Sequence, residues 1–551
     1  MLAAIPSGAR RGCRSVARAG RPQASTEGAP LTDPPAPART RAAAAPFWIA
    51  ALALIALRVP HLTGPLTDPH AWRQCDTVHF ALDFYHRGFD LLHPAVCWLG
   101  AHRTILLNFP LSEAITALLY RAFGPSPFWD RIVALAFFLV SAAYVRGIVR
   151  RLAGERAGAL ATLAYLAFPL GQYFSRVPHI EFSVLAAVDG TLYHALRACS
   201  ERRLSHTLAA TLCGVIAALI KAPYLATIGL PLVLILLAAP ALATALRLAL
   251  VLGASGGAFL VWRRYVDAVN ATVPDWTFLP DFYKEVNPIW RYTGTMAERR
   301  DIASWIRIAK RLVYEVATPA GLALALPSMM WRSRAPAATE AVTRLPNARL
   351  VAFGWLLGCF GLVVVFFRLS VLHNYYQLPF LAPAAMLVGL GMDELWDRVP
   401  RTGRVPLAAI AFAGFLGYAA WAPRTLEYDH IDWLRIEAGR VIEPLVPAGD
   451  LMVAADFSTL PPTDPRLLFR ANHEGWPMRA AEITPDRLEK LRPYGAKWVV
   501  VLTDPDHPDV QPPAFLEPAA TATRPVLHDG KQIGTVHVYE IARLPRAGGK
   551  S

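Results

Sequence analysis

Residues 350–368 read LVAFGWLLGCFGLVVVFFR, an apolar run whose single charge stands at its last position. A run of this length can cross the hydrocarbon core of a bilayer as a helix, which takes about 20 residues. Similar runs recur along the 551-residue chain, which is 54% hydrophobic and 17% charged. Soluble proteins carry about 25% charged residues. The sequence therefore predicts an α-helical polytopic membrane protein.

We expect about eleven spanning helices, each an apolar run near twenty residues long. The predicted spans are 45–60, 128–149, 157–175, 180–198, 205–221, 223–239, 244–263, 308–330, 350–368, 376–393 and 405–422. A further apolar segment, NFPLSEAITALLYRAF (108–123), is shorter and carries Glu113. We expect this segment to lie at the membrane interface.

Arginine-rich segments separate alternate spans and predict the topology. They read RRLAGER (150–156), RACSERR (197–203), WRSRAPAATEAVTRLPNAR (331–349) and DRVPRTGR (397–404). An excess of arginine and lysine marks cytoplasmic loops, so the N-terminus is expected in the cytoplasm and the chain after 423 on the outer side. Loop charge of this kind explains the net charge of +14, and no nucleic-acid partner is expected.

Three parts follow from this topology. Residues 1–44 are rich in Ala, Arg, Pro and Ser and predict a disordered basic cytoplasmic tail. Residues 45–423 form the membrane domain, with a long first outer loop at 61–127. Residues 424–551 are expected to form a small soluble α/β domain on the outer side.

The α/β prediction for the last part depends on four short segments. DLMVAAD (450–456), KWVVVLT (497–503) and TVHVYEI (535–541) have the composition of strands, and PDRLEKLRPYG (485–495) that of a helix with a glycine stop. Strands interleaved with a helix indicate a mixed sheet.

Polar and titratable residues gather in the segments that the topology places outside. These segments are the first loop, SRVPHIE (175–181), KAPY (221–224), residues 264–306 and RLSVLHNYYQLP (368–379). The inner loops are merely basic. We therefore expect any chemistry to take place on the outer side of the membrane.

The first loop contains WRQCDTVHFALDFYHRGF (72–89), which predicts an amphipathic helix with Asp76, His79 and Asp83 at i, i+3, i+7 spacing. Such a helix can lie on the membrane surface and present its acids to a lipid headgroup. The alternative is a plain connector with a solvated acidic face. Cys75 and Cys97 share this loop, and a disulfide between them requires an oxidising compartment.

Other outer residues have both a functional and an ordinary interpretation. Lys221 ends an apolar run and can bind a lipid phosphate, or simply reach the interface. Clusters of polar and aromatic residues stand at the starts of two spans: Arg176, His179 and Glu181 at one, and His373, Tyr375 and Tyr376 at the other. Tyrosines at an interface are also the ordinary aromatic belt. The cysteines and histidines show no metal-ligand spacing.

Taken in order, HAWRQCDT, FPL, RVPHIEF, KAPY and HNYYQLP resemble the polytopic glycosyltransferases of the GT-C class. The nearest group is the protein O-mannosyltransferase-like family 39, with bacterial relatives that glycosylate lipid A, such as the aminoarabinose transferases, or cell-wall polymers. The resemblance implies a GT-C fold in the bacterial inner membrane. It implies a sugar donor linked to polyprenyl phosphate in the lipid bilayer, and an acceptor hydroxyl on a lipid, glycan or protein at the periplasmic side. It specifies no cofactor and leaves a divalent metal open.

The resemblance also implies roles for individual residues. An acid of the first outer loop serves as general base, which is Asp76 or, as the alternative, Asp68. Cations then stabilise the leaving phosphate, and Lys221, Arg73 and Arg176 are the candidates. The remaining candidates for substrate binding are His70, Trp72, Gln74, His179, Glu181, His373, Tyr375 and Tyr376.

One position departs from the family pattern. Relatives often carry glutamate before Phe-Pro, and this chain has Asn108. Glu113 and Glu181 are the candidates to supply that acid.

Two rival functions stay open beside sugar transfer. A flippase or transporter of lipid-linked sugars needs the spans and a phosphate-binding lysine, but no first-loop carboxylate. A non-catalytic protein of envelope assembly would explain the departure at Asn108.

Overall fold

The computed structural model of the chain describes residues 39–544, apart from 286–287, 331–344, 427, 429 and 459–461. Most of the predicted tail and most of the arginine-rich segment 331–349 therefore lie outside the described residues. Helix α1, Arg39–Ala56, begins before the predicted end of the tail at residue 44.

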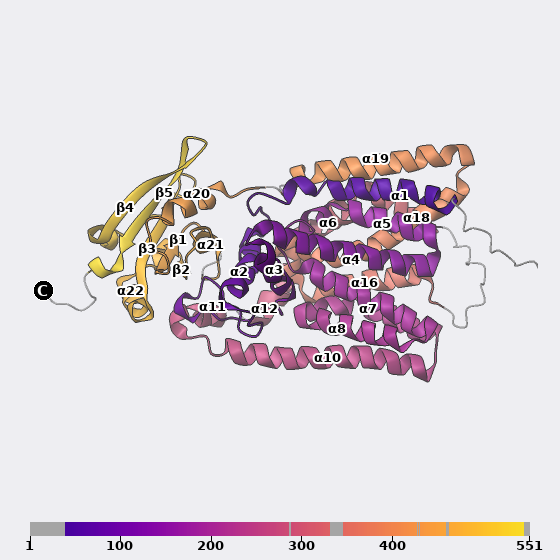
Figure 1. Cartoon of the computed structure of the whole chain (residues 1–551), viewed down its shortest axis with the longest axis horizontal. Helices are drawn as coiled ribbons and strands as arrows, with labels where there is room; N and C mark the ends of the chain where they lie inside the picture. The colour runs from indigo at the N-terminus through magenta and orange to yellow at the C-terminus, as the bar shows by residue number, and fades with distance from the viewer. Residues whose placement is uncertain are drawn as a thin grey trace, which may run out of the picture. The chain divides into compact units, whose positions relative to one another are not determined.

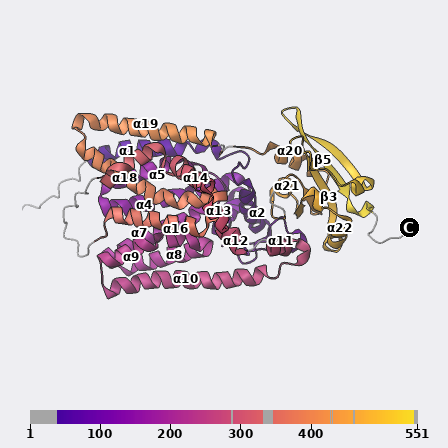
Figure 2. The same ribbon diagram turned by 180° about the vertical axis from the view of Figure 1, so that it is seen from behind.

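Long apolar helices form a bundle around a core of buried aliphatic and aromatic side chains. They run side by side in Figure 1 and in the reverse view of Figure 2. Their bounds are α4 Pro127–Ala153, α5 Glu155–Ala167, α7 Glu181–Glu201, α8 Leu204–Leu225, α9 Gly229–Ala238, α10 Leu242–Asn270, α16 Ala348–Val365, α18 Leu381–Arg398 and α19 Arg401–Thr425. On α10, Leu246, Leu250 and Val261 are exposed, as expected of a helix that faces lipid.

Six helical segments within the described part of the chain are long and apolar enough to cross a membrane. They are Pro127–Ala153, Leu204–Ala238, Leu242–Asn270, Ala348–Val365, Asn374–Arg398 and Arg401–Thr425. A bent pair, Ile302–Ala317 with Pro319–Met330, makes a seventh if it is one span. The multi-pass membrane character is confirmed, but the number eleven is not.

Several predicted spans are shorter or broken because polar residues and prolines interrupt them. The predicted span 157–175 occurs as α5 and α6, Pro169–Phe174, which are separated at Pro169 because proline cannot donate the helical hydrogen bond. The predicted span 308–330 occurs as α14, Ile302–Arg311, a π-helical turn at Leu312–Ala317, and α15, Pro319–Met330. Its two halves are bent by 85°.

Two further breaks lie where the predicted outer loops begin. The backbone of Lys221 is non-helical, with φ −159° and ψ 76°, and Pro223 follows it. The predicted spans 205–221 and 223–239 are thus α8 and α9, with the interruption at Lys221. A 3₁₀ segment, Asn374–Phe380, precedes α18. Broken helices at membrane depth are tolerated where the freed backbone is buried in protein or lines a cavity.

The first loop forms two helices, α2 at Ala71–Arg87 and α3 at Leu111–Phe123. Both were predicted, but α2 does not lie on a surface with a solvated acidic face. Asp76 is only 2% exposed, because α2 packs against α3 on one side and against α21, Arg466–Arg470, on another. The interpretation of α2 as a connector with a solvated acidic face is therefore wrong.

The C-terminal part contains a five-stranded mixed sheet in the order β2-β1-β3-β5-β4. The strands are β1 Leu451–Ala455, β2 Gly475–Met478, β3 Ala496–Thr503, β4 Ala520–His528 and β5 Lys531–Glu540. Pairing is parallel between β1 and both β2 and β3, and antiparallel from β3 through β5 to β4.

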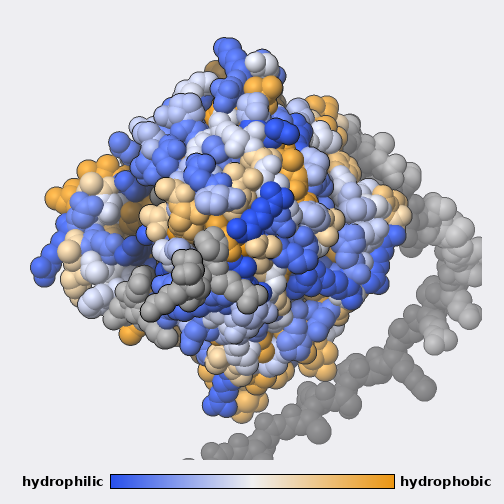
Figure 3. All heavy atoms as spheres, turned by 90° about the vertical axis from the view of Figure 1, so that its left-hand side faces the viewer, coloured by the Kyte–Doolittle hydropathy of each residue, from blue (hydrophilic) through white to orange (hydrophobic). Residues whose placement is uncertain are grey.

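The sheet has an apolar layer on each face. Val500 and Leu502 pack on the side of α20, Trp433–Ile442, and α21, whereas Val499 and Val501 pack with residues of α22, Pro485–Leu491. The surface at this end of the molecule is mainly hydrophilic (Figure 3). The predicted α/β domain is present, although the sequence analysis missed β2 and β4.

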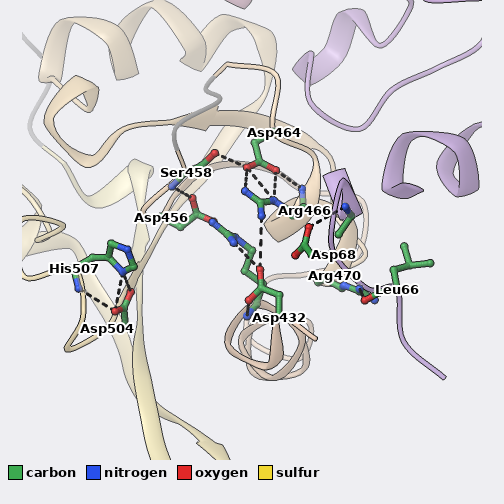
Figure 4. Close-up of polar contacts among 12 residues, drawn as sticks. Leu66, Asp68, Asp432, Asp456, Ser458, Asp464, Arg466, Arg470, Asp504 and His507 are labelled. Carbon is green, nitrogen blue, oxygen red and sulfur yellow. Dashed lines mark hydrogen bonds and ion pairs between the residues drawn. The ribbon is translucent and has the colours of Figure 1, made fainter. Parts of the chain in front are cut away.

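A charged network joins the elements at the start of this domain (Figure 4). Arg435 bonds to Asp432 and Asp456, each at 2.6 Å, and Arg466 bonds to Asp464 at 2.7 Å. The Arg466 guanidinium holds the pKa of the Asp464 carboxyl down at about 2, against the opposing effect of burial.

Several contacts link the C-terminal part to the first loop directly, and two of them lie just before α2. Arg470 donates to the Leu66 carbonyl at 3.4 Å (Figure 4), and the Asp68 amide donates to the His430 carbonyl at 2.8 Å. Both contacts fix the segment just before α2 to the C-terminal part of the chain.

Candidate functional site

Lys221 lies at the centre of the group of outer residues that the sequence analysis selected. Its Nζ donates to Glu181 Oε1 at 2.8 Å and to the Tyr224 hydroxyl at 3.1 Å. It also lies 4.1 Å from the centre of the Tyr376 ring and 4.9 Å from that of Tyr375. The break in α8 directs the Lys221 side chain toward Glu181 and Tyr224. Lys221 therefore does not simply extend toward the membrane interface.

Aromatic rings and imidazoles surround this ion pair. The rings of His373 and Tyr375 stack with centres 5.1 Å apart and an angle of 8°. His70 and His179 each lie 4.9 Å from the Tyr375 ring centre. Residues 300 positions apart in the sequence thus meet around one tyrosine, as their shared placement on the outer side predicts.

Several buried polar atoms here have no hydrogen-bond partner within the described part of the chain. They are both ring nitrogens of His179, Glu181 Oε2 and His373 Nδ1. Burial lowers the pKa of His179 well below its ordinary value and that of His373 to about 3, so both imidazoles are neutral at pH 7. Leaving such an atom unpaired costs about 1–3 kcal/mol, and an unpaired cluster therefore indicates a site for a polar ligand.

A hydrogen-bonded chain that the sequence analysis missed fixes His70. Its Nε2 lies 3.1 Å from Asn374 Oδ1, and Asn374 Nδ2 donates to Glu315 Oε2 at 3.1 Å. The Tyr428 hydroxyl donates to the same Glu315 oxygen. Because the Asn374 oxygen accepts, His70 carries its proton on Nε2. Glu315 stands within the predicted span 308–330, and an acid inside a span is the signal that could have found it.

Arg73 connects α2 to this cluster. Its guanidinium donates to the Asn108 side-chain oxygen and lies 3.6 Å from Asp76 Oδ2. Its positive charge also acts on Lys221 and His179. A second positive charge therefore acts near Lys221.

Asp76 is buried next to Arg73, and its Oδ1 accepts a hydrogen bond from Trp98 Nε1 at 2.9 Å. Burial raises the pKa of the Asp76 carboxyl to about 6, although Arg73 and Trp98 both favour the charged form. A pKa near the working pH suits a general base. Trp98 was not selected from the sequence.

Glu113 is one of the two candidates to supply the acid that Asn108 replaces. It is fully buried, its Oε2 accepts a hydrogen bond from the Ser112 hydroxyl at 3.0 Å, and its carboxyl lies near the Asn108 side chain. Burial raises the pKa of its carboxyl. Glu181 contacts Lys221 instead, so of the two candidates Glu113 is the one that adjoins Asn108.

The other selected residues lie around this core with more structural contacts. The Asp68 carboxylate accepts from the Ala71 amide at 3.1 Å at the start of α2. Gln74 donates to the Thr67 carbonyl at 2.7 Å. Arg176 is buried with its guanidinium 5.4 Å from the Tyr173 ring centre, and the Trp72 ring lies 6.2 Å from that of His373.

Two remaining expectations concern cysteine and metal. Cys75 and Cys97 are both free and buried, so the disulfide is not formed. Within the described part of the chain, no group of three or more His, Cys, Asp or Glu side chains is arranged to hold a metal ion.

Comparison with known proteins extends these observations. Residues 108–262 match the family described as dolichyl-phosphate-mannose-protein mannosyltransferase. The matched stretch begins after α2, so it includes Lys221 and Glu181 but not Asp76. Curated protein sequences yield no match.

Solved structures show the fold. ArnT from Cupriavidus metallidurans bound to undecaprenyl phosphate aligns with a TM-score of 0.61 at 16% identity, over 92% of this chain and 100% of that one. Its apo state aligns with a TM-score of 0.60 at 15% identity, over 93% and 100%. The Archaeoglobus fulgidus oligosaccharyltransferase complex with Zn and sulfate aligns at 0.51 and 11%, over 84% and 68%. The chain has the ArnT fold. The GT-C resemblance read from the sequence is confirmed.

Proposed function

We propose that this protein is a glycosyltransferase that moves a sugar from a polyprenyl-phosphate donor to an acceptor hydroxyl. The observation that carries the proposal is the environment of Lys221. This lysine lies at a helix break between Glu181 and three tyrosine rings. Neutral histidines beside it have ring nitrogens without a partner among the described residues. A lipid phosphate supplies the acceptor oxygens that such a site lacks. The ArnT structure with the same fold is bound to undecaprenyl phosphate, which supports this class of donor.

In this proposal, Lys221 and Arg73 stabilise the negative charge that develops on the leaving phosphate. The sugar–phosphate bond breaks with both electrons going to the phosphate oxygen, which needs no proton because the polyprenyl phosphate is a stable anion. Fixed cations in a site that excludes water are effective at this task. The neutral imidazoles of His70, His179 and His373 offer hydrogen bonds to the sugar or the phosphate without adding charge.

The acceptor hydroxyl gives up its proton as its oxygen attacks the anomeric carbon, and we assign that proton to Asp76. Asp76 shares Arg73 with the phosphate site and has a pKa of about 6, so it is ionised at neutral pH and able to accept. Asp68 is the weaker candidate because its carboxylate is engaged with the Ala71 amide. Direct attack from the face opposite the phosphate inverts the anomeric configuration.

We place the reaction on the periplasmic side of a bacterial inner membrane. The support is the arginine distribution of the loops, which predicts a cytoplasmic N-terminus and an external C-terminal domain. Residues 1–44, 45–423 and 424–551 remain our division of the chain. The predicted end of the membrane domain falls close to the end of α19 at Thr425.

The test is transfer by the purified full-length protein in lipid nanodiscs. A polyprenyl-phosphate donor with a radiolabelled sugar is supplied with envelope extract, and the product is followed by chromatography and mass spectrometry. We expect labelled acceptor and free polyprenyl phosphate in equal amounts. Movement of intact donor across a vesicle membrane without bond cleavage would instead establish the flippase. Donor binding with neither cleavage nor movement would establish the non-catalytic role.

A further inference from the structure

A cavity of about 270 Å³ lies between the second half of α2 and the turn that joins α21 to β2. Its lining includes His79, Asp83 and Arg87 on α2, and Phe469 and Glu474 opposite them. It is separate from the group around Lys221, and the proposed transfer makes no use of it. Its size suits a small part of a larger molecule rather than a lipid chain.

The lining combines hydrogen-bonding groups of several kinds with apolar surface. Carboxylates, a guanidinium, the Asn472 amide and the imidazoles of His79, His86 and His473 all contribute, beside Phe469 and Leu82. Among the described residues, His79 Nε2 is buried without a hydrogen-bond partner, and burial lowers the pKa of His79 to about 4. Its imidazole is therefore neutral, with a ring nitrogen that a ligand hydroxyl can satisfy.

The charges around the cavity are balanced. Arg87 donates to Asp83 at 2.9 Å and to Glu474 at 2.7 Å, and Arg103 makes a second ion pair with Glu474. Two carboxylates are thus matched by two guanidiniums, so an ionic ligand gains nothing from net charge. Alternating donors and acceptors next to an aromatic ring suit a molecule that has hydroxyl groups on one side and C–H groups on another. That is the chemistry of an uncharged sugar.

The cavity also lies along the helix that carries the proposed base. Asp76 and Asp83 are seven residues apart on α2, which is about two turns and roughly 10 Å of helix. Residues at i, i+3 and i+7 share a helix face, so His79 and Asp83 continue the face on which Asp76 stands. An oligosaccharide can extend over such a distance.

We infer that this cavity binds an uncharged sugar unit of the acceptor, and hence that the acceptor is a glycan. This inference rests on the proposed glycosyl transfer, because only then is a second saccharide required near Asp76. The cavity holds a unit away from the reacting hydroxyl and so selects and positions the acceptor chain.

The experiment measures binding of three neutral trisaccharides, maltotriose, mannotriose and N,N′,N″-triacetylchitotriose, to the full-length protein in nanodiscs by saturation-transfer NMR. Glucuronic acid and glucosamine serve as charged probes. We expect at least one trisaccharide to bind. Asp83→Asn and Glu474→Gln should weaken that binding about tenfold or more, because each removes a charged hydrogen-bond acceptor. His86→Trp should weaken it by filling the cavity.

Asp90→Asn is the matched control, since Asp90 is an exposed acid that pairs with His93 and does not line the cavity. It should bind the trisaccharide as the unchanged protein does. Three results would overturn the inference: no trisaccharide binds, only a charged probe binds, or binding is unaffected by all three cavity variants.

Polyprenyl phosphate binding, measured on the same samples, separates this inference from the proposed function. The cavity variants should bind polyprenyl phosphate normally. Loss of trisaccharide binding alone then concerns only the acceptor site. Failure of the unchanged protein to bind polyprenyl phosphate, with trisaccharide binding intact, would instead contradict the proposed donor.

Discussion

Glu181 and Lys221 form an ion pair with a separation of 2.8 Å, and the Glu181 side chain is 1% exposed. Glu181 begins α7, and Lys221 interrupts α8. A buried charge pair of this kind contributes little net stability, because desolvation of the two ions offsets their attraction. In the proposed function, this pair keeps the Lys221 ammonium group fixed and desolvated before the donor binds. The second oxygen of Glu181 has no hydrogen-bond partner among the described residues.

Replacing Lys221 with alanine should weaken binding of polyprenyl phosphate by about 10- to 100-fold, the range expected for loss of one hydrogen bond to a charged group. The measurement is an equilibrium titration in nanodiscs. Lys497→Ala is the control, because Lys497 is an exposed lysine that pairs with Asp450 in the sheet domain. Equal affinity in the two variants would remove Lys221 from the phosphate site.

Asp76→Asn should abolish sugar transfer and leave donor binding intact, because the amide keeps the hydrogen bond from Trp98 but cannot accept the acceptor proton. Asp68→Asn is the comparison that decides between the two acids of the first loop. Its side-chain oxygen still accepts from the Ala71 amide, so we expect most of the activity to remain. Transfer by Asp76→Asn at a near-normal rate, with Asp68→Asn inactive, would reverse the assignment.

The rate of transfer should depend on the ionisation of Asp76. Burial raises the pKa of this carboxyl to about 6, so the base is ionised above pH 6 and protonated below it. We expect kcat/KM to be level at neutral pH and to fall about tenfold per pH unit below about pH 6. Donor binding is measured in parallel between pH 5 and 8. A profile that stays level down to pH 5 would exclude Asp76 as the titrating base.

Tyr428→Phe should destabilise the protein by about 1–3 kcal/mol, because buried Glu315 loses one of its hydrogen-bond donors and keeps Asn374 and a longer contact with Arg311. The substitution should also lower the rate of sugar transfer, since the hydrogen bonds from Glu315 through Asn374 orient His70. The free energy of unfolding is measured by denaturant titration. Tyr494→Phe is the control, because Tyr494 is 39% exposed and stacks on Trp276. An equal loss of stability in both variants would contradict a specific role for Tyr428.

Much of the candidate site could be located from the sequence. Polar residues in apolar spans cost free energy when they are buried in a membrane, so they are rare and stand out in the sequence. Lys221, Glu181 and His373 could be selected in this way, and their meeting follows from their placement on one side. The contacts themselves could not be predicted, since they depend on three helix breaks at Lys221, Thr318 and Asn374. Glu315 was overlooked because a predicted span was treated as uniformly apolar.

The helix α2 shows a different limit. Its residues, including Asp76 and Asp83 seven positions apart, were correctly predicted to form a helix. The elements that pack around this helix were not predicted. Hydrophobic periodicity describes one helix at a time. It cannot show that α21, almost 400 residues later in the sequence, covers the side of α2 that α3 leaves uncovered. The buried state of Asp76 and the cavity beside Asp83 both follow from that distant packing.

Reporter fusions can test the predicted topology. Three candidate spans, Ala348–Val365, Asn374–Arg398 and Arg401–Thr425, separate residue 330 from residue 430. An odd number of crossings places the two positions on opposite sides. We expect a fusion after 330 to be active as a cytoplasmic reporter and one after 430 as a periplasmic reporter, because arginines cluster in the segments 331–349 and 397–404. Fusions that report the same side would show that one of these helices does not cross, and a cytoplasmic signal from both would place the sheet domain in the cytoplasm.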